Sequence, residues 1–227
     1  MKNYCVLLAF LFVTNNLLLS QEKFSGGLYF SPEISWFKPD NKKVTNEKSR
    51  LSYGFGLTGD ISLTNTFALN LGLGFLNAGG SLKYADSIVK VEAVDTTYIN
   101  LGTNKILKYK LQYVELPIAI KGRTKEIGYI SYFMKFGINP LFRFKSRADV
   151  DVDSNDDIKQ EVRAISFAYH VGAGITYSLK GNTKLLFEIL FRNGLTDIEK
   201  IKTIKSGVSK DYKNILNVIE IRAGLVF

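Results

Sequence analysis

The carboxy-terminal stretch, residues 214–227, alternates between two kinds of side chain up to the last residue. One set is largely apolar and ends in an aromatic residue: Asn217, Ile219, Ile221, Ala223, Leu225 and Phe227. The set in between contains an opposite-charge pair: Val218, Glu220, Arg222, Gly224 and Val226. Successive side chains of a β-strand point to opposite faces, so this segment predicts a strand with one apolar face and one partly charged face.

The same alternation recurs along the chain and predicts eight strands, residues 24–37, 51–63, 67–84, 109–122, 129–147, 162–179, 184–197 and 214–227. Their connections alternate between short (64–66, 123–128 and 180–183) and long (38–50, 85–108, 148–161 and 198–213). Short periplasmic turns and long external loops are typical of barrels that cross the outer membrane. We therefore predict an all-β fold, an eight-stranded antiparallel transmembrane β-barrel in the outer membrane, with both ends of the barrel domain on the short-turn side.

Two other folds agree with parts of this pattern. Residues 88–93 also alternate and predict a hairpin within the connection 85–108, and a hairpin that joined the sheet would make a ten-stranded barrel. A soluble lipocalin-like barrel would point its bulky side chains inward. Here the other face is small, Gly-rich and charged, which suits a narrow barrel interior better than a solvated surface.

The first twenty residues have the features of a secretory signal peptide. Lys2 precedes the apolar residues 6–13 and 17–19, and cleavage after Ser20 would leave a barrel domain of residues 21–227. Cys5 is the only cysteine, so the mature chain would contain neither disulfides nor a cysteine-ligated metal.

Composition agrees with a membrane barrel. Mean hydropathy is +0.02, as expected when lipid-facing and interior residues alternate, and 12 Tyr and 16 Phe are available for aromatic girdles at the membrane borders. The net charge is +9. For an exported protein we expect anionic lipid, including lipopolysaccharide, as the counter-charge, and no nucleic acid.

Charged residues recur on the face that the alternation turns inward. The predicted lumen charge network is Glu33, Asp60, Glu115, Lys121, Lys135, His170, Glu188, Arg192, Glu220 and Arg222. The lumen of an eight-stranded barrel is only wide enough for side chains to fill it, and buried charges must pair. We therefore expect a salt-bridged plug that closes the pore; a narrow gated channel is the alternative.

Other groups of residues suggest chemistry less strongly. Asp149, Asp151, Asp153, Asp156 and Asp157 begin like a calcium-binding loop, but a glycine and a bidentate glutamate are missing. We therefore interpret them as a solvated acidic loop, with weak calcium binding as the alternative. Ser166, His170 and Glu188 would suit a hydrolase, but residues four apart in a strand lie about 13 Å apart. We predict no catalytic, cofactor-binding or metal-binding residue.

Basic residues cluster in the segments on the long-loop side and predict contacts with lipopolysaccharide phosphates, with plain solvation as the alternative. The three clusters are Lys42, Lys43, Lys48 and Arg50, then Arg143, Lys145 and Arg147, then Lys200, Lys202, Lys205, Lys210 and Lys213.

Residues 113–121, YVELPIAIK, resemble a hallmark of the PorT-like outer-membrane β-barrel family of Bacteroidota, whose members show Tyr-x-x-Leu-Pro-hydrophobic-x-hydrophobic-Lys in a central strand. The resemblance implies insertion by the barrel-assembly machinery, with Phe227 in the recognition signal. It also implies contacts with secretion-machinery proteins, because the founding member is linked to type IX secretion.

We therefore expect a non-enzymatic protein that acts by structure and contact, and the resemblance implies a role as an accessory of type IX secretion. A small passive channel and a lipid-modifying enzyme are the alternatives. Pro117, inside the motif, cannot donate to a sheet ladder and predicts a bulge.

Overall fold

The computed structural model describes residues 24–40, 42–85, 89–91, 98–100, 105–150, 152–157, 162–179, 181–198, 203–205, 208–210 and 213–227. The proposed signal peptide, residues 1–20, lies outside these described residues. No helix in the described part of the chain is long and apolar enough to cross a membrane.

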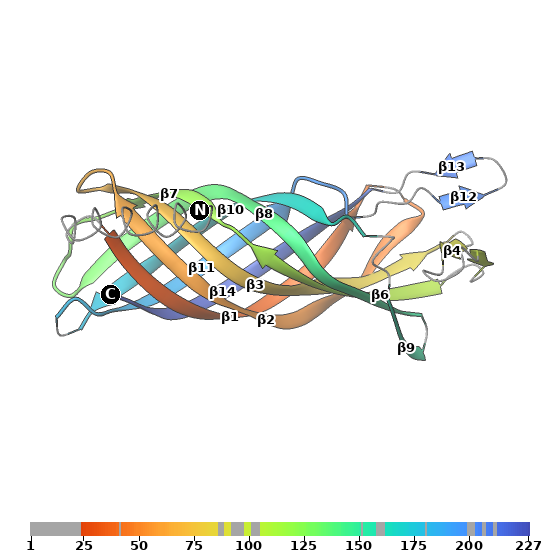
Figure 1. Ribbon diagram of the computed structural model, residues 1–227, viewed down its shortest axis with the longest axis horizontal. Helices are drawn as coiled ribbons and strands as arrows, with labels where there is room; N and C mark the ends of the chain where they lie inside the picture. The colour runs from red at the N-terminus through yellow and green to blue at the C-terminus, as the bar shows by residue number, and fades with distance from the viewer. Residues whose placement is uncertain are drawn as a thin grey trace, which may run out of the picture.

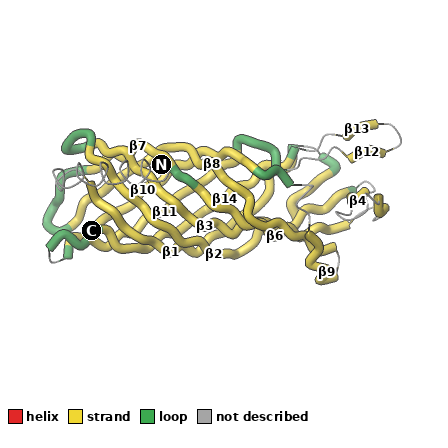
Figure 2. The backbone as a smooth tube through the Cα atoms, viewed as in Figure 1, coloured by secondary structure: helices red, strands yellow, loops and turns green. Residues whose placement is uncertain are grey.

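The fold is a closed antiparallel barrel, seen from the side in Figures 1 and 2. Its strands are β1 (Phe24–Pro39), β2 (Val44–Ser62), β3 (Phe67–Tyr84), β6 (Lys105–Glu115), β7 (Ile118–Arg123), β8 (Ile130–Val150), β10 (Ile165–Ser178), β11 (Lys184–Gly194) and β14 (Asn214–Val226). Each pairs with its neighbour around the ring, and β14 returns to β1. Since β6 and β7 share one place between β3 and β8, the ring has eight positions. The predicted eight-stranded antiparallel barrel is therefore confirmed.

Three short hairpin elements lie outside the ring, at the end opposite the carboxy-terminus (Figure 1). β4 (Val89–Val91) pairs only with β5 (Tyr98–Asn100), and β12 (Thr203–Lys205) pairs only with β13 (Val208–Lys210). β9 (Val152–Asp157) folds back on the end of β8. The hairpin expected within 85–108 is thus present, but it does not enter the sheet and the ten-stranded alternative is wrong.

Pro117 interrupts a strand without the bulge that the sequence suggested. Glu115 pairs with Gly74 of β3, and Ile118 pairs with Leu71. Two residues therefore lie between the paired positions on each strand, and neither strand has an extra one. The carbonyl of Pro117 still accepts a hydrogen bond of 3.0 Å from the Gly72 amide. The prediction of a bulge was wrong because the missing amide hydrogen only breaks the ladder and inserts no residue.

The connection between β1 and β2 is much shorter than the predicted loop of residues 38–50. β1 continues to Pro39, β2 begins at Val44, and Val44 pairs with Tyr84 of β3. Val44 is buried, and the five positions that follow it are exposed. The first residue of β2 therefore packs on the interior, whereas the next stretch of the strand is exposed on both faces.

The two faces of β3 show where the barrel leaves the membrane. Near the short turns Phe67 and Leu73 are exposed, and the inward positions are small or polar, such as Asn70. Farther along, Leu76 and Leu82 are buried, while Lys83 stands on the outward face. The polarity of the two faces therefore reverses along the strand, which indicates that the long-connection end stands in water and has its own apolar core.

This apolar core fills the interior at that end. Its buried members are Phe37, Val44, Leu76, Ala78, Leu82, Tyr84, Leu107, Tyr109, Leu111, Tyr113, Leu141, Ala148, Val162, Ala168, Ile198, Leu216 and Val218, here called the apolar plug. Phe37 meets Tyr109 edge to face at 5.4 Å, and the hydroxyls of Tyr84 and Tyr109 lie 3.0 Å apart. The sequence analysis did not anticipate this plug.

Candidate functional site: the barrel interior

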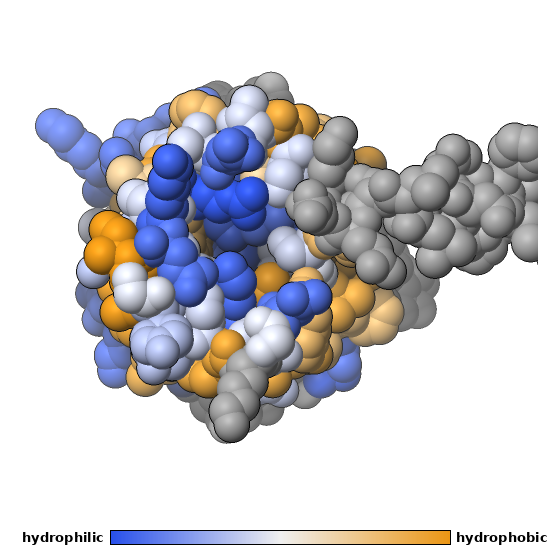
Figure 3. Space-filling view, turned by 90° about the vertical axis from the view of Figure 1, so that its left-hand side faces the viewer, coloured by the Kyte–Doolittle hydropathy of each residue, from blue (hydrophilic) through white to orange (hydrophobic). Residues whose placement is uncertain are grey.

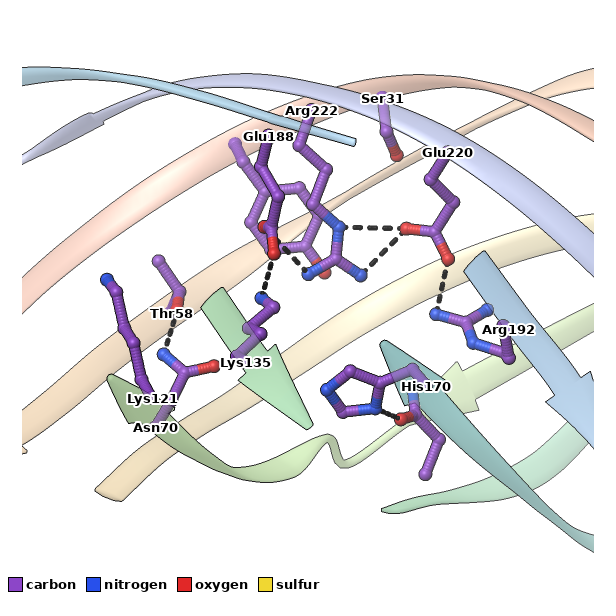
Figure 4. Close-up of polar contacts among 12 residues, drawn as sticks. Ser31, Thr58, Asn70, Lys121, Lys135, His170, Glu188, Arg192, Glu220 and Arg222 are labelled. Carbon is purple, nitrogen blue, oxygen red and sulfur yellow. Dashed lines mark hydrogen bonds and ion pairs between the residues drawn. The ribbon is translucent and has the colours of Figure 1, made fainter. Parts of the chain in front are cut away.

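All ten residues of the predicted lumen network point inward and are buried. They come from seven of the eight ring positions, and their exposed fractions range from 0% for His170 to 7% for Asp60 and Lys121. Figure 4 shows the side chains of Lys121, Lys135, His170, Glu188, Arg192, Glu220 and Arg222 converging from strands that are distant in the sequence. The inward position follows from strand alternation, but the identity of each partner depends on the register between strands.

Two arginines and two glutamates form the centre of this network. Arg192 Nη2 lies 2.6 Å from Glu115 Oε2 and 2.5 Å from Glu220 Oε1. Arg222 Nε donates to Glu220 Oε2 at 2.8 Å, and its Nη2 lies 3.4 Å from Glu115 Oε1. Each glutamate is therefore shared by both arginines, so the four charges act as one unit.

Tyr29 places a further polar contact beside this centre. Its ring lies 4.2 Å from the Arg222 guanidinium carbon, and its hydroxyl donates to Glu115 Oε1 at 3.3 Å. The sequence analysis missed Tyr29. Tyr29 and Glu33 are an even number of residues apart in one strand, so their side chains point to the same face. This alternation could have predicted that Tyr29 points inward.

Two further ion pairs extend the network toward the short turns. Lys135 Nζ lies 2.8 Å from Glu188 Oε1, and Lys121 Nζ lies 2.6 Å from Asp60 Oδ2. Asn70 donates to Asp60 Oδ1 at 2.6 Å. It also donates to Thr58 Oγ1 at 2.8 Å (Figure 4). The sequence analysis also missed Asn70 as a member of the network.

Glu33 differs from the other buried acids because no cation pairs with it among the residues that the structure describes. Its Oε1 accepts a hydrogen bond from Ser31 at 3.1 Å, and its Oε2 has no hydrogen-bond partner there. Glu33 also lies opposite Glu220 in the register of β1 and β14. The interior therefore holds five acids and four cations. Glu33 is the one acid of the five that gains little from the network.

Glycines make room for these large side chains. A Cβ at Gly172 would lie 2.6 Å from Glu188 Oε1, and a Cβ at Gly74 would lie 2.7 Å from the Tyr29 hydroxyl and 2.8 Å from Glu115 Oε1. Any larger residue at these two positions would displace a buried charged or polar group. The Gly-rich inward face therefore has a steric cause.

His170 does not form a hydrolase triad with Ser166 and Glu188. Its Nδ1 is hydrogen-bonded to Asn139 Oδ1, while the amide nitrogen of Asn139 donates to Glu115 Oε2 at 3.0 Å. Because the amide donates to Glu115, its oxygen faces the imidazole, and Nδ1 carries the proton. Glu188 is occupied by Lys135, so His170 belongs to the central charge network.

The acidic segment after β8 differs from the expected solvated loop. Asp149 is buried in β8, and its Oδ2 lies 2.6 Å from Lys110 Nζ. Asp153, Asp156 and Asp157 belong to β9, and Asp151 lies outside the described residues. The expectation was wrong for Asp149 because β8 extends beyond residue 147 and pairs there with β6.

The described part of the chain contains no group of three or more His, Cys, Asp or Glu side chains that could hold a metal ion.

The free space inside the barrel narrows steeply from the short-turn end. A hollow of about 320 Å³ opens there, lined by polar side chains (Figure 3). Behind it, beside Lys135, Glu188 and Arg222, the cavity holds only about 10 Å³. That is room for about one water molecule. The ion pairs and then the apolar plug follow, so the lumen is closed.

A model of the family described as "Outer membrane protein beta-barrel domain" matches residues 19–200. Among solved structures, the chain is similar to Neisserial surface protein A (12% identity, 89% of this chain and 95% of that chain, TM-score 0.48) and to OprG from Pseudomonas aeruginosa (10%, 90% and 95%, 0.46). It is also similar to Ail of Yersinia pestis in complex with the heparin analogue sucrose octasulfate (14%, 90% and 99%, 0.42). No curated protein matched. Since the family model covers most of the sequence, the chain belongs to the outer membrane protein beta-barrel domain family, and its location is the outer membrane.

Proposed function

We propose that this protein is a non-enzymatic, non-conducting barrel that works by presenting its outer wall and its loops to partners. The observation that carries the proposal is the filled interior. The ion pairs centred on Arg192 and Arg222 occupy the membrane region, and the apolar plug follows them. A hydrated ion would have to separate buried charge pairs and then cross an apolar region, and both steps are costly.

Conductance in planar bilayers tests this proposal directly. We expect the purified protein to insert without stepwise current. As a positive control, a variant in which Leu76 and Leu111 of the plug and Arg192 of the network are all replaced by Gly should show current, provided that it still folds. Reproducible openings of the wild-type protein, at a size independent of contaminating porins, would contradict the proposal and favour the passive channel.

Within this proposal, the partner class is a protein of the type IX secretion machinery. The support is the resemblance of residues 113–121 to the PorT-like motif, which in the fold spans the break between β6 and β7. Crosslinking in the native outer membrane, followed by purification in mild detergent, tests it. Recovery of secretion components that is lost when residues 86–104 are shortened is the expected result. Recovery of lipid and assembly factors alone would remove the secretion role.

We also propose lipopolysaccharide as a lipid partner at the outer border of the membrane. Lys110 and Arg147 are paired neighbours on β6 and β8, and Gln112 and Lys145 are the next pair toward the apolar belt. Phe144, 63% exposed, stands beside them. Phosphates would meet the cations while acyl chains cover the aromatic side chain. Replacing Lys110, Lys145 and Arg147 by Gln should lower the lipopolysaccharide that copurifies, and an unchanged amount would refute this contact.

The barrel-assembly machinery is the third proposed partner, through the terminal residue. Phe227 is 55% exposed, and its backbone exchanges hydrogen bonds with Gly26 of β1 at 2.7 and 3.1 Å. The side chain is therefore displayed while the strand that carries it closes the ring. Phe227→Ala should reduce the amount of folded barrel in the outer membrane without lowering the stability of barrel refolded in vitro. Equal assembly of both forms would contradict this role.

A further inference from the structure

We propose that the hollow at the short-turn end binds a small phosphorylated molecule on the periplasmic side. This hollow, called the vestibule below, has a volume of about 320 Å³. Figure 3 looks into it and shows hydrophilic residues around a central depression. Its charged lining residues are Asp60, Lys121, Arg123, Lys125, Glu126 and Lys184. This inference is independent of the contact role proposed above.

In the part of the chain that the structure describes, the acidic side chains of the vestibule are paired, whereas some of its cations are not. Lys121 is committed to Asp60 at 2.6 Å. Glu126 accepts a hydrogen bond of 2.8 Å from Ser178 and lies 3.6 Å from Lys184. Both acidic side chains of the lining therefore already have partners.

Two cations remain without an acid partner in the described structure. Arg123 donates to the Ser62 hydroxyl at 2.8 Å, so only one of its guanidinium nitrogens is used. Lys125, two residues along the same turn, has an exposed side chain that pairs with no acid among the described residues. The remaining acid at the rim is the terminal carboxylate of Phe227, and the Gly26 amide donates to its oxygen. An arginine and a lysine that line the same hollow form a suitable pair for a phosphate group.

Uncharged polar groups line the rest of the vestibule and would suit the body of such a ligand. They are supplied by Ser25, Asn65, Thr124, Ser131, Thr176 and Asn182. Phe133 adds an apolar surface deeper inside, where its ring lies 4.3 Å from Lys121 Nζ. The volume lies at the lower limit for small-molecule sites, about 300 Å³. Hydroxyl and amide groups around a space of this size match a molecule such as a sugar phosphate.

The fold explains why these residues meet only in the tertiary structure. Arg123 and Lys125 lie at the turn between β7 and β8, Lys184 begins β11, and Asp60 is near the end of β2. Barrel closure brings the short turns into one rim. Because the lumen behind is closed, a ligand would bind at the mouth without passing through.

Calorimetric titration of the full mature chain in phosphatidylcholine nanodiscs tests the proposal with glucose 1-phosphate as the probe and glucose as the neutral control. We expect saturable binding of glucose 1-phosphate, weaker at high salt, and no binding of glucose. Arg123→Gln with Lys125→Gln should weaken binding at least tenfold. The matched control is Lys83→Gln with Lys108→Gln, which removes two charges on β3 and β6 at the opposite end and should leave binding unchanged.

The source of the phosphate is resolved by repeating the titration in nanodiscs that contain phosphatidylglycerol. If a lipid headgroup is the natural occupant, the apparent affinity for glucose 1-phosphate falls; if the occupant is a soluble molecule, the affinity stays the same. Absence of saturable binding, equal binding by the double variant, or an equal loss in the control variant would each overturn the proposal. Lys125→Gln alone, in an exposed turn, provides the same comparison if the double variant folds poorly.

Discussion

Glu33 on β1 and Glu220 on β14 face each other, and replacing each by glutamine should change the stability of the barrel differently. Glu220 lies 2.5 Å from Arg192 and 2.7 Å from Arg222, whereas Glu33 has only a hydrogen bond from Ser31. Both are at most 3% exposed. Glu220→Gln and Glu33→Gln are therefore matched substitutions, with the same chemistry and nearly the same depth but different partners.

The expected size of each effect follows from these partners. Glu220→Gln leaves both buried arginines with less countercharge, and breaking a buried pair costs about 3–5 kcal/mol. This cost corresponds to a change of roughly two to more than three orders of magnitude in the unfolding equilibrium. Glu33→Gln removes a buried carboxyl group that has no cation partner among the described residues. We therefore expect no loss of stability from Glu33→Gln, and a gain where the cost of burying the carboxyl group is the larger effect.

Reversible unfolding in detergent micelles or lipid vesicles measures both changes. Trp36 is the only tryptophan and stacks on Phe191 with ring centroids 6.4 Å apart, so its fluorescence reports the loss of the barrel. For Glu220→Gln we expect the urea midpoint to fall by about 1–5 M, using slopes of about 1–3 kcal/mol per M. For Glu33→Gln the midpoint should stay or rise at the same slope.

Two results would refute this reasoning. Equal loss of stability in both variants would mean that the amide substitution itself, rather than the lost ion pairs, determines the change. A stable Glu220→Gln protein would mean that Arg192 and Arg222 do not depend on that carboxylate. The double variant gives the coupling between the two sites directly.

Three further predictions use the same unfolding measurement. Leu76→Ala, in the apolar plug, should cost about 2–5 kcal/mol because it leaves a cavity in a closed core, and a negligible cost would show that this end is loosely packed. Phe136→Arg, on an outward position that is 60% exposed, should cost about 2–4 kcal/mol in vesicles and much less in micelles, whereas equal costs would place it outside the membrane. A Cβ at Gly72 would lie 2.8 Å from Pro117 Cγ, so Gly72→Ala should be better tolerated beside Pro117→Ala than alone; simple additivity would show no steric conflict.

The class of fold follows from the sequence because strand alternation is a local property. Each strand of a membrane barrel separates lipid from lumen, so its two faces differ and the period of two is visible without tertiary information. The inward position of charged residues such as Glu115, Glu188 and Arg222 is predictable for the same reason. All that is needed is the parity of each residue within its own strand.

The partners within the interior were determined by the tertiary structure. Register between strands brings Arg192 to both Glu115 and Glu220 and leaves Glu33 without a cation from the part of the chain that the structure describes. One strand's sequence carries no information about that difference, because pairing depends on contacts between residues far apart in the chain. The sharing of acids between two arginines is therefore a property of the closed ring.

The two ends of the barrel show the same difference between what the sequence predicts and what only the tertiary structure decides. Leu76 and Leu82 continue the inward parity of β3, but only the closed barrel shows that they meet a core above the membrane. Arg123 and Lys125 lie at the turn between β7 and β8, Lys184 begins β11, and these two places reach one vestibule only when the ring closes. The sequence alone determined the faces of each strand. The assembled barrel decided which side chains share a layer, because that depends on the relative positions of strands that are distant in the chain.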